Sequence, residues 1–333
     1  MKRIDMTYGR IGYDGIHRSQ SEIETWFVDK VKAGIVKRLG NLRLKDRNEK
    51  KVRTFLLRHI DKMLLGKPSE LERYRLLYDW YKVKLPVPKA GAGKRGKRKR
   101  RPKTFHDKLL HAFGYKAARS GTLTELAQRL NVKCCPYCNL HYTLCIEDFD
   151  KHNQQVLMAR FEFDHFIDKA SYPFLSMSLY NLIPSCPVCN HGKSQDVLPL
   201  TFHPYHADIG KTFRFRVVNP IHLFAGKNNL DTIQLQLEKT SAADPQSYDK
   251  VFHVKKQYER HRDEVEDLFA RAYQYYYYNV PDNFGFIGSP DLSKRLQLGF
   301  YPDERDINLR PMTKFKQDLW QQARLEVTKV SFP

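Results

Sequence analysis

Two short motifs contain the residues best suited to bind a metal ion. Cys135 and Cys138 lie in the stretch CCPYC, and Cys186 and Cys189 lie in SCPVC. A spacer of two residues lets both thiolates of a tight turn reach one ion, and two such turns supply the four sulfurs of a tetrahedral site. Four sulfur ligands favour Zn2+ and leave no coordination position open, so we expect a structural zinc ion, not a catalytic one.

Two other cysteines lie close to these motifs. Cys134 competes with Cys135 as a ligand, but only Cys135 has the two-residue spacing to Cys138. Cys145 lies in HYTLCIEDF, a probable strand by its pattern, and we interpret it as a core thiol. Clustered cysteines and the lack of a secretory signal at the start of the chain are typical of metal binding in a reducing compartment. We therefore expect a cytoplasmic protein.

A second set of chemically active residues lies between the two cysteine pairs. The alternating run ARFEF leads to Asp164–His165, Asn181 follows in NLI, and Asn190 and Lys193 follow the second pair in CNHGK. The order D-H, N-L, C-x2-C-N-x2-K resembles the HNH endonuclease family, in which two strands and a helix surround one divalent ion. The resemblance covers residues 134–200.

The resemblance implies a role for each of these residues. His165 would be the general base that activates a water molecule, and Asp164 and Asn190 would bind the catalytic ion. Two oxygen donors favour Mg2+ or Mn2+. His191, next to Asn190, is the alternative ligand.

Three further positions follow from the same resemblance. Asn181 would hold the loop that aims the base, through hydrogen bonds to the backbone. Lys193 would lie near the substrate phosphate, and Lys169, in the loop after the base, is a second candidate for that contact. Strict strand alternation would send Asp164 and His165 to opposite faces. Both can serve one site only if the strand bends or ends there.

The charge of the chain indicates a polyanionic partner. The 333 residues carry a formal net charge of +21, which favours nucleic acid over an anionic membrane surface. Eight of the ten residues from Lys94 to Lys103 are Lys or Arg, which predicts a mobile phosphate-binding arm that also serves as a linker. No apolar run is long enough to span a membrane, so we expect no membrane partner.

The remaining patterns predict an α+β protein. "SEIETWFVDKVKAGIVKRL" predicts a helix capped by Ser21 with Glu24, and its apolar residues recur at helical spacing. Residues 212–226 and 230–240 alternate like strands and predict a hairpin, and residues 248–278 predict one long helix. The expected regions are a basic helical region 1–88, a basic flexible linker 89–104, a helical lead-in 105–133, an HNH core with its zinc site 134–200, and a mixed C-terminal region 201–333.

These observations predict a Mg2+- or Mn2+-dependent endonuclease that hydrolyses phosphodiester bonds of DNA. By analogy with the family, it would be an effector of bacterial anti-phage defence, with a partner protein of that system. One alternative is a non-catalytic, zinc-binding nucleic-acid-binding module. Another is a nuclease subunit that a partner protein regulates.

Overall fold

The computed structural model describes residues 2–6, 10–12, 15–44, 46–80, 104–149, 152–220, 223, 230–277 and 290–329. Within these residues, helices are combined with small antiparallel two-stranded sheets, so the α+β prediction is confirmed. The basic tract 89–103 lies outside the described residues, but Thr104 at the end of the predicted linker is described and caps the next helix. No helix in the described part of the chain is long and apolar enough to cross a membrane.

The N-terminal region is helical, as predicted. It contains α1 (Gln20–Gly40), α2 (Arg47–Arg58), α3 (Ile60–Leu65) and α4 (Pro68–Trp80). The apolar residues of α1 that recur at helical spacing are all buried: Ile23, Phe27, Val31, Ile35 and Leu39. α2 and α3 are separate helices because the chain leaves helical geometry at His59.

The cap predicted for α1 is wrong by one half-turn. Ser19, not Ser21, caps the helix, and its hydroxyl accepts the backbone N–H of Glu22 while the Glu22 carboxylate accepts the N–H of Ser19. Both pairs have the same spacing, so the sequence could not distinguish them. Glu24 is instead drawn inward, where it accepts hydrogen bonds from Tyr180 and Lys67.

The helical lead-in to the cysteines consists of three helices. They are α5 (Phe105–Phe113), α6 (Tyr115–Ala118) and α7 (Thr122–Leu130). Gly114 separates the first two because it adopts φ +75°, a left-handed conformation that glycine tolerates. The side chain of Arg38 closes over this turn and donates to the carbonyl of Ala112 at 2.7 Å.

The central part of the chain forms two short strand pairs and one helix. β3 (Cys145–Phe149) pairs with β4 (Gln155–Ala159), and β5 (Glu162–His165) pairs with β6 (Leu182–Ser185). In the second pair Asp164 faces Ile183 and His165 faces Leu182. β6 leads into α8 (Pro187–Lys193), which packs on β5. A further pair, β1 (Arg10–Ile11) with β2 (His17–Arg18), lies near the N-terminus.

The C-terminal region contains the predicted hairpin. β7 (Phe213–Val218) pairs with β8 (Gln234–Lys239), and α12 (Pro290–Leu298) and α13 (Thr313–Val327) follow later in the chain. α13 covers the free edge of β7. The Asp318 carboxylate accepts the N–H of Phe215, and Gln322 exchanges two hydrogen bonds with the backbone of Val217.

The predicted long helix over residues 248–278 is wrong. It is divided into α9 (Pro245–Phe252), α10 (Val254–Tyr258) and α11 (Arg262–Tyr277). His253 has φ +49°, and a residue in this left-handed region cannot continue a right-handed helix. The break lets α9 turn toward the cysteines. Tyr275 and Tyr276 pack on Trp320, and Tyr278 lies outside the described residues.

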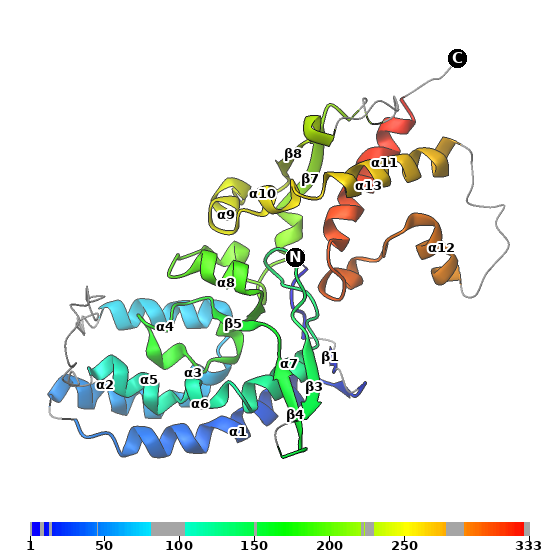
Figure 1. Ribbon diagram of the computed structural model, residues 1–333. Coiled ribbons are helices and arrows are strands. Elements are labelled where there is room, and N and C mark those ends of the chain that lie inside the picture. The colour runs from blue at the N-terminus through cyan, green and yellow to red at the C-terminus, as the bar shows by residue number, and fades with distance from the viewer. Residues whose placement is uncertain are drawn as a thin grey trace, which may run out of the picture.

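One continuous apolar core extends through all of these regions, from Ile4 to Ala323. Figure 1 shows α8 between the N-terminal helices and the C-terminal elements α9 and α10. The close approach of α8 to α9 is visible at Gly192, where a Cβ atom would lie 3.3 Å from the carbonyl oxygen of Val251. The segment 134–200 is therefore enclosed by chain from both sides.

Candidate functional site

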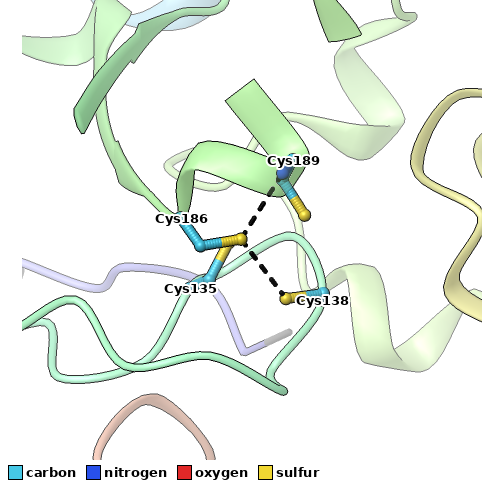
Figure 2. A group of neighbouring side chains, drawn as sticks. All are labelled: Cys135, Cys138, Cys186 and Cys189. Atoms are coloured by element: carbon cyan, nitrogen blue, oxygen red, sulfur yellow. Dashed lines mark hydrogen bonds between the residues drawn. The ribbon is translucent and has the colours of Figure 1, made fainter. Parts of the chain in front are cut away.

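The four predicted cysteines come together at one point. The sulfur atoms of Cys135, Cys138, Cys186 and Cys189 all lie within 4.8 Å of one another, and all four residues are buried. Figure 2 shows that one pair comes from a loop and the other from the beginning of α8. Four sulfurs so arranged could hold a metal ion such as zinc.

Local backbone structure explains why each pair turns its sulfurs inward. Cys186 caps α8, and its sulfur accepts the N–H of Cys189 at 3.4 Å. In the first pair, the sulfur of Cys138 accepts the N–H of Leu140 at 3.4 Å. Asn139 adopts φ +53° directly after Cys138, which reverses the chain within one residue. Each two-residue spacer therefore works as a turn.

The electrostatics of this four-cysteine cluster favour a cation. Burial opposes ionisation of Cys135, but hydrogen bonds from the neighbouring thiols outweigh it and hold its pKa well below the ordinary value. Hydrogen bonds to Cys135 in turn raise the pKa of Cys138 and of Cys189. Crowded thiolates repel one another, and a bound divalent ion would offset that repulsion.

Of the two adjacent cysteines, Cys135 belongs to the cluster, as the two-residue spacing predicts. Cys134 is buried but is not part of the cluster. Its N–H donates to the carbonyl of Asn308, and burial raises the pKa of its thiol. Cys145 lies in β3 as a half-buried thiol against the core, as predicted.

β5 presents two carboxylates to α8. Glu162 and Asp164 are two residues apart in the strand and therefore lie on the same face. Two residues of α8 reach this face: the side-chain amide of Asn190 donates to Glu162, and the Lys193 ammonium lies 3.4 Å from Asp164 Oδ1. Asn190 and Asp164 are thus brought to the same side of one short strand.

Asp164 is only 3% exposed, and both of its oxygens have partners. Oδ1 accepts from Lys193, and Oδ2 accepts the hydroxyl of Tyr137 at 2.7 Å. Burial raises the pKa of Asp164, and the Lys193 charge partly offsets this effect. Tyr137 lies between the two cysteines of the first pair, so this one residue connects the cluster to Asp164.

Lys193 is buried, whereas the sequence predicted an accessible side chain near the substrate phosphate. Its side chain is 0% exposed, and its ammonium donates to the carbonyl of His165 at 2.9 Å as well as to Asp164. The sequence predicted a contact with the substrate phosphate, which needs an accessible cation. In this structure Lys193 neutralises a buried carboxylate and supports the backbone at the end of β5.

His165 is the last residue of β5 and is 4% exposed. Its Nε2 lies 3.0 Å from the carbonyl of Ser176, which can only accept, so Nε2 carries the proton. Nδ1 is then the basic nitrogen, and it lies 3.4 Å from the ammonium of Lys169. Tyr115 packs edge-on to the ring. Burial, with the Lys169 charge, lowers the pKa of His165 to about 3.

The loop from β5 to β6 is organised by Asn181. Its side chain accepts the N–H of Ile167 at 2.7 Å and donates to the carbonyls of Ile167 and Leu175, each at 3.0 Å. The N-terminal helices support the same loop from outside. Ser178 donates to the carbonyl of Met63 at 2.5 Å, at the end of α3.

Glu162 is the residue that the sequence did not single out. Its Oε2 accepts from Asn190 and lies 3.2 Å from His191 Nε2, so both candidate ligands of α8 meet at the same carboxylate. The period of two along β5 could have revealed it, because Glu162 precedes Asp164 by two residues. Tyr137 had no such signal, since nothing in CCPYC shows that its hydroxyl reaches Asp164.

The described residues contain no further group of three or more Cys, His, Asp and Glu ligands close enough to share a metal ion. Any ion near β5 would therefore depend on donors such as Asn190. Comparison of the chain with protein-family models, with curated proteins and with solved structures found no match.

Proposed function

We propose that this protein is a metal-dependent nuclease that hydrolyses phosphodiester bonds of DNA, with β5, β6 and α8 as a ββα-metal core of the HNH type. One observation carries the proposal. Asn190 and Lys193 of α8 contact Glu162 and Asp164 on one face of β5, directly beside the four-cysteine cluster. The D-H and C-N-x2-K motifs, separated in sequence, thus meet in space.

His165 is the general base of the proposed reaction. Its Nε2 is tied to the carbonyl of Ser176, so Nδ1 takes the proton of the attacking water. Lys169 lies beside Nδ1 and is half-exposed, which makes it the cation best placed to meet the substrate phosphate. A phosphate there would offset the Lys169 charge and raise the pKa of His165 toward neutral pH, where a base is most effective.

Asp164 and Asn190 would hold the catalytic ion. Their carboxylate and amide oxygens suit Mg2+ or Mn2+, and such an ion supplies positive charge that stabilises the phosphate and the leaving oxygen. The Lys193 charge opposes the rise in the pKa of Asp164 that burial causes, and Asn181 fixes the loop that follows the base. The four cysteines would hold a structural Zn2+ ion.

The decisive experiment compares cleavage of supercoiled plasmid, single-stranded DNA and RNA by the wild type and by His165→Ala, with Mg2+ and with Mn2+. His203→Ala is the matched control, because His203 is equally buried and burial lowers its pKa to about 3 as well. We expect a loss of about 10²- to 10⁴-fold in His165→Ala only. Equal cleavage by both variants would remove His165 as the base.

A second candidate function is a non-catalytic, zinc-binding nucleic-acid module. It is favoured by the burial of Asp164 and His165 and by the low pKa of His165, which makes a weak base in the protein alone. This module would bind the same substrates with unchanged affinity after His165→Ala and would cleave none of them. A nuclease subunit controlled by a partner of a defence system would instead gain activity when it is purified with that partner.

A further inference from the structure

Tyr137 connects the four-cysteine cluster to Asp164. It lies between Cys135 and Cys138 in the first turn, it is 0% exposed, and its hydroxyl donates to Asp164 Oδ2 at 2.7 Å. A single side chain therefore joins the predicted zinc site to the predicted ligand of the catalytic ion.

The contact leaves Asp164 with unused acceptor positions. A carboxylate has about four acceptor positions, and Tyr137 and Lys193 each use one, on different oxygens. Tyr137 contributes direction without charge, because a phenol hydroxyl is a neutral donor near pH 7 and this one points at Asp164 Oδ2. Lys193 contributes the charge. The two partners fix the orientation of the carboxylate, and Lys193 balances its charge.

Tyr137 is itself held from the C-terminal region. Its ring stacks on Phe252 of α9, with centroids 4.5 Å apart and planes at 19°, and its carbonyl accepts the hydroxyl of Tyr248 at 2.6 Å. The cysteines on both sides are fixed by the cluster. The ring consequently has one position, which aims its hydroxyl at Asp164.

We propose that Tyr137 is a positioning residue that orients Asp164 for the divalent cation, so that the four-cysteine cluster is part of the catalytic scaffold and not only a support of the fold. This inference rests on the proposed function. It also gives α9 a role, because Tyr248 and Phe252 set the position of Tyr137. Tyr137 touches neither water nor substrate, so it acts only through Asp164.

The test is Tyr137→Phe, which removes one hydroxyl and keeps the ring stacked on Phe252. Tyr142→Phe is the matched control, because Tyr142 lies in the same loop and is 49% exposed. Both proteins are loaded with zinc, and Mn2+ affinity is measured by EPR titration beside zinc content and cleavage rate. We expect Tyr137→Phe to keep one zinc per chain and to bind Mn2+ about 10- to 100-fold more weakly, with a matching loss of cleavage at low Mn2+ that high Mn2+ partly restores.

A purely structural role predicts a different pattern. It would lower zinc content and thermal stability and leave Mn2+ affinity unchanged in the protein that remains folded, which would overturn the inference. If Tyr137→Phe does not retain zinc, Tyr248→Phe replaces it, because that change loosens the support of Tyr137 and keeps its hydroxyl. An unchanged Mn2+ affinity in Tyr248→Phe would then count against the inference.

Failure of the nuclease proposal gives a separate result. If the wild type cleaves no nucleic acid but binds Mn2+ through Asp164, as the loss of binding in Asp164→Asn would show, the proposed reaction is wrong and the Mn2+ titration still decides the role of Tyr137. If cleavage is found and Tyr137→Phe matches the wild type in rate and Mn2+ affinity, the proposed function stands and the role of Tyr137 is refuted.

Discussion

The four-cysteine cluster and the Asp164–His165 pair are neighbours that are assembled in different ways. The cluster is made of two turns, each defined by residues three apart in sequence. The acid–histidine pair depends on partners from several parts of the chain, which are Tyr137 and Tyr115 before it, Lys169 and Ser176 in the loop after it, and Lys193 of α8. Local spacing builds each of the two turns, and the fold then has only to bring them together, whereas every partner of the second site comes from a different part of the chain.

The largest effect should come from breaking the cluster. In Cys186→Ser one ligand is lost, and a structural zinc site contributes on the order of 10 kcal/mol of apparent folding free energy. We expect loss of zinc by metal analysis and loss of the cooperative thermal transition by circular dichroism. Because Tyr137 lies between two cysteines of the cluster and donates to Asp164, the acid–histidine pair should also lose its geometry.

Cys145→Ser is the control for this change. Cys145 is a half-buried thiol outside the cluster, so its substitution should leave zinc content at the wild-type value. A zinc-loaded, cooperatively folded Cys186→Ser protein would contradict the assignment of the four ligands.

Breaking the acid–histidine side should have a smaller effect. Lys193→Met leaves the buried Asp164 carboxylate without its cation, and removal of one partner of a buried pair costs about 3–5 kcal/mol. The loss of the charge should also raise the pKa of Asp164 further. Urea denaturation of the zinc-loaded protein measures the change in the free energy of unfolding, and zinc content should stay constant.

The double variant Asp164→Asn with Lys193→Met isolates the pairing itself. Because the amide needs no counter-charge and still accepts from Tyr137, the double variant should lose less stability than the two single variants added together. Strict additivity would show that the two residues do not stabilise each other.

A change of pH tests the buried histidine of the acid–histidine pair beside a second buried histidine, His203. His165 and His203 both have a pKa lowered to about 3 by burial, against about 6.5 in an unfolded chain. Their contribution to stability is fully present above the unfolded value and is lost as the pH falls toward the folded value. As the pH falls below about 6.5, each histidine should lower the free energy of unfolding by about 1.4 kcal/mol per pH unit, or by about 2 kcal/mol at about pH 5.

The measurement is urea denaturation from about pH 7 to about pH 5 with excess zinc, in the wild type and in His203→Gln. Removing His203 should reduce the slope of stability against pH by about 1.4 kcal/mol per pH unit. An unchanged slope would contradict the lowered pKa of His203.

The contrast between the two sites also explains what the sequence could predict. C-x2-C spacing is a local property, so it identified the four cysteines of the cluster and rejected Cys134. The amphipathic pattern of α1 and the alternation of β7 and β8 are equally local, and both were confirmed. The break at His253 was missed because the helical pattern continues through it while the backbone turns left-handed.

The partners of Asp164 and His165 were beyond such reasoning. Spacing in the sequence cannot show that Lys193 turns inward, or that the hydroxyl of Tyr137 crosses to β5. Both contacts depend on how α8 and the first cysteine turn pack around one short strand. They are properties of tertiary packing, which the motif order indicates only as a neighbourhood.

The smallest expected effect compares two buried tyrosines, one beside each site. Tyr258 donates to the carbonyl of Cys138 at 2.9 Å, and Tyr205 donates to the carbonyl of Leu182, opposite His165, at 3.3 Å. Each change to Phe removes one hydrogen bond worth about 1 kcal/mol. Only Tyr258→Phe should weaken zinc binding in a competition with a chelator, because Cys138 is a ligand and Leu182 is not. Equal weakening in both variants would show that the two sites respond as one unit, and that the cluster is not locally assembled.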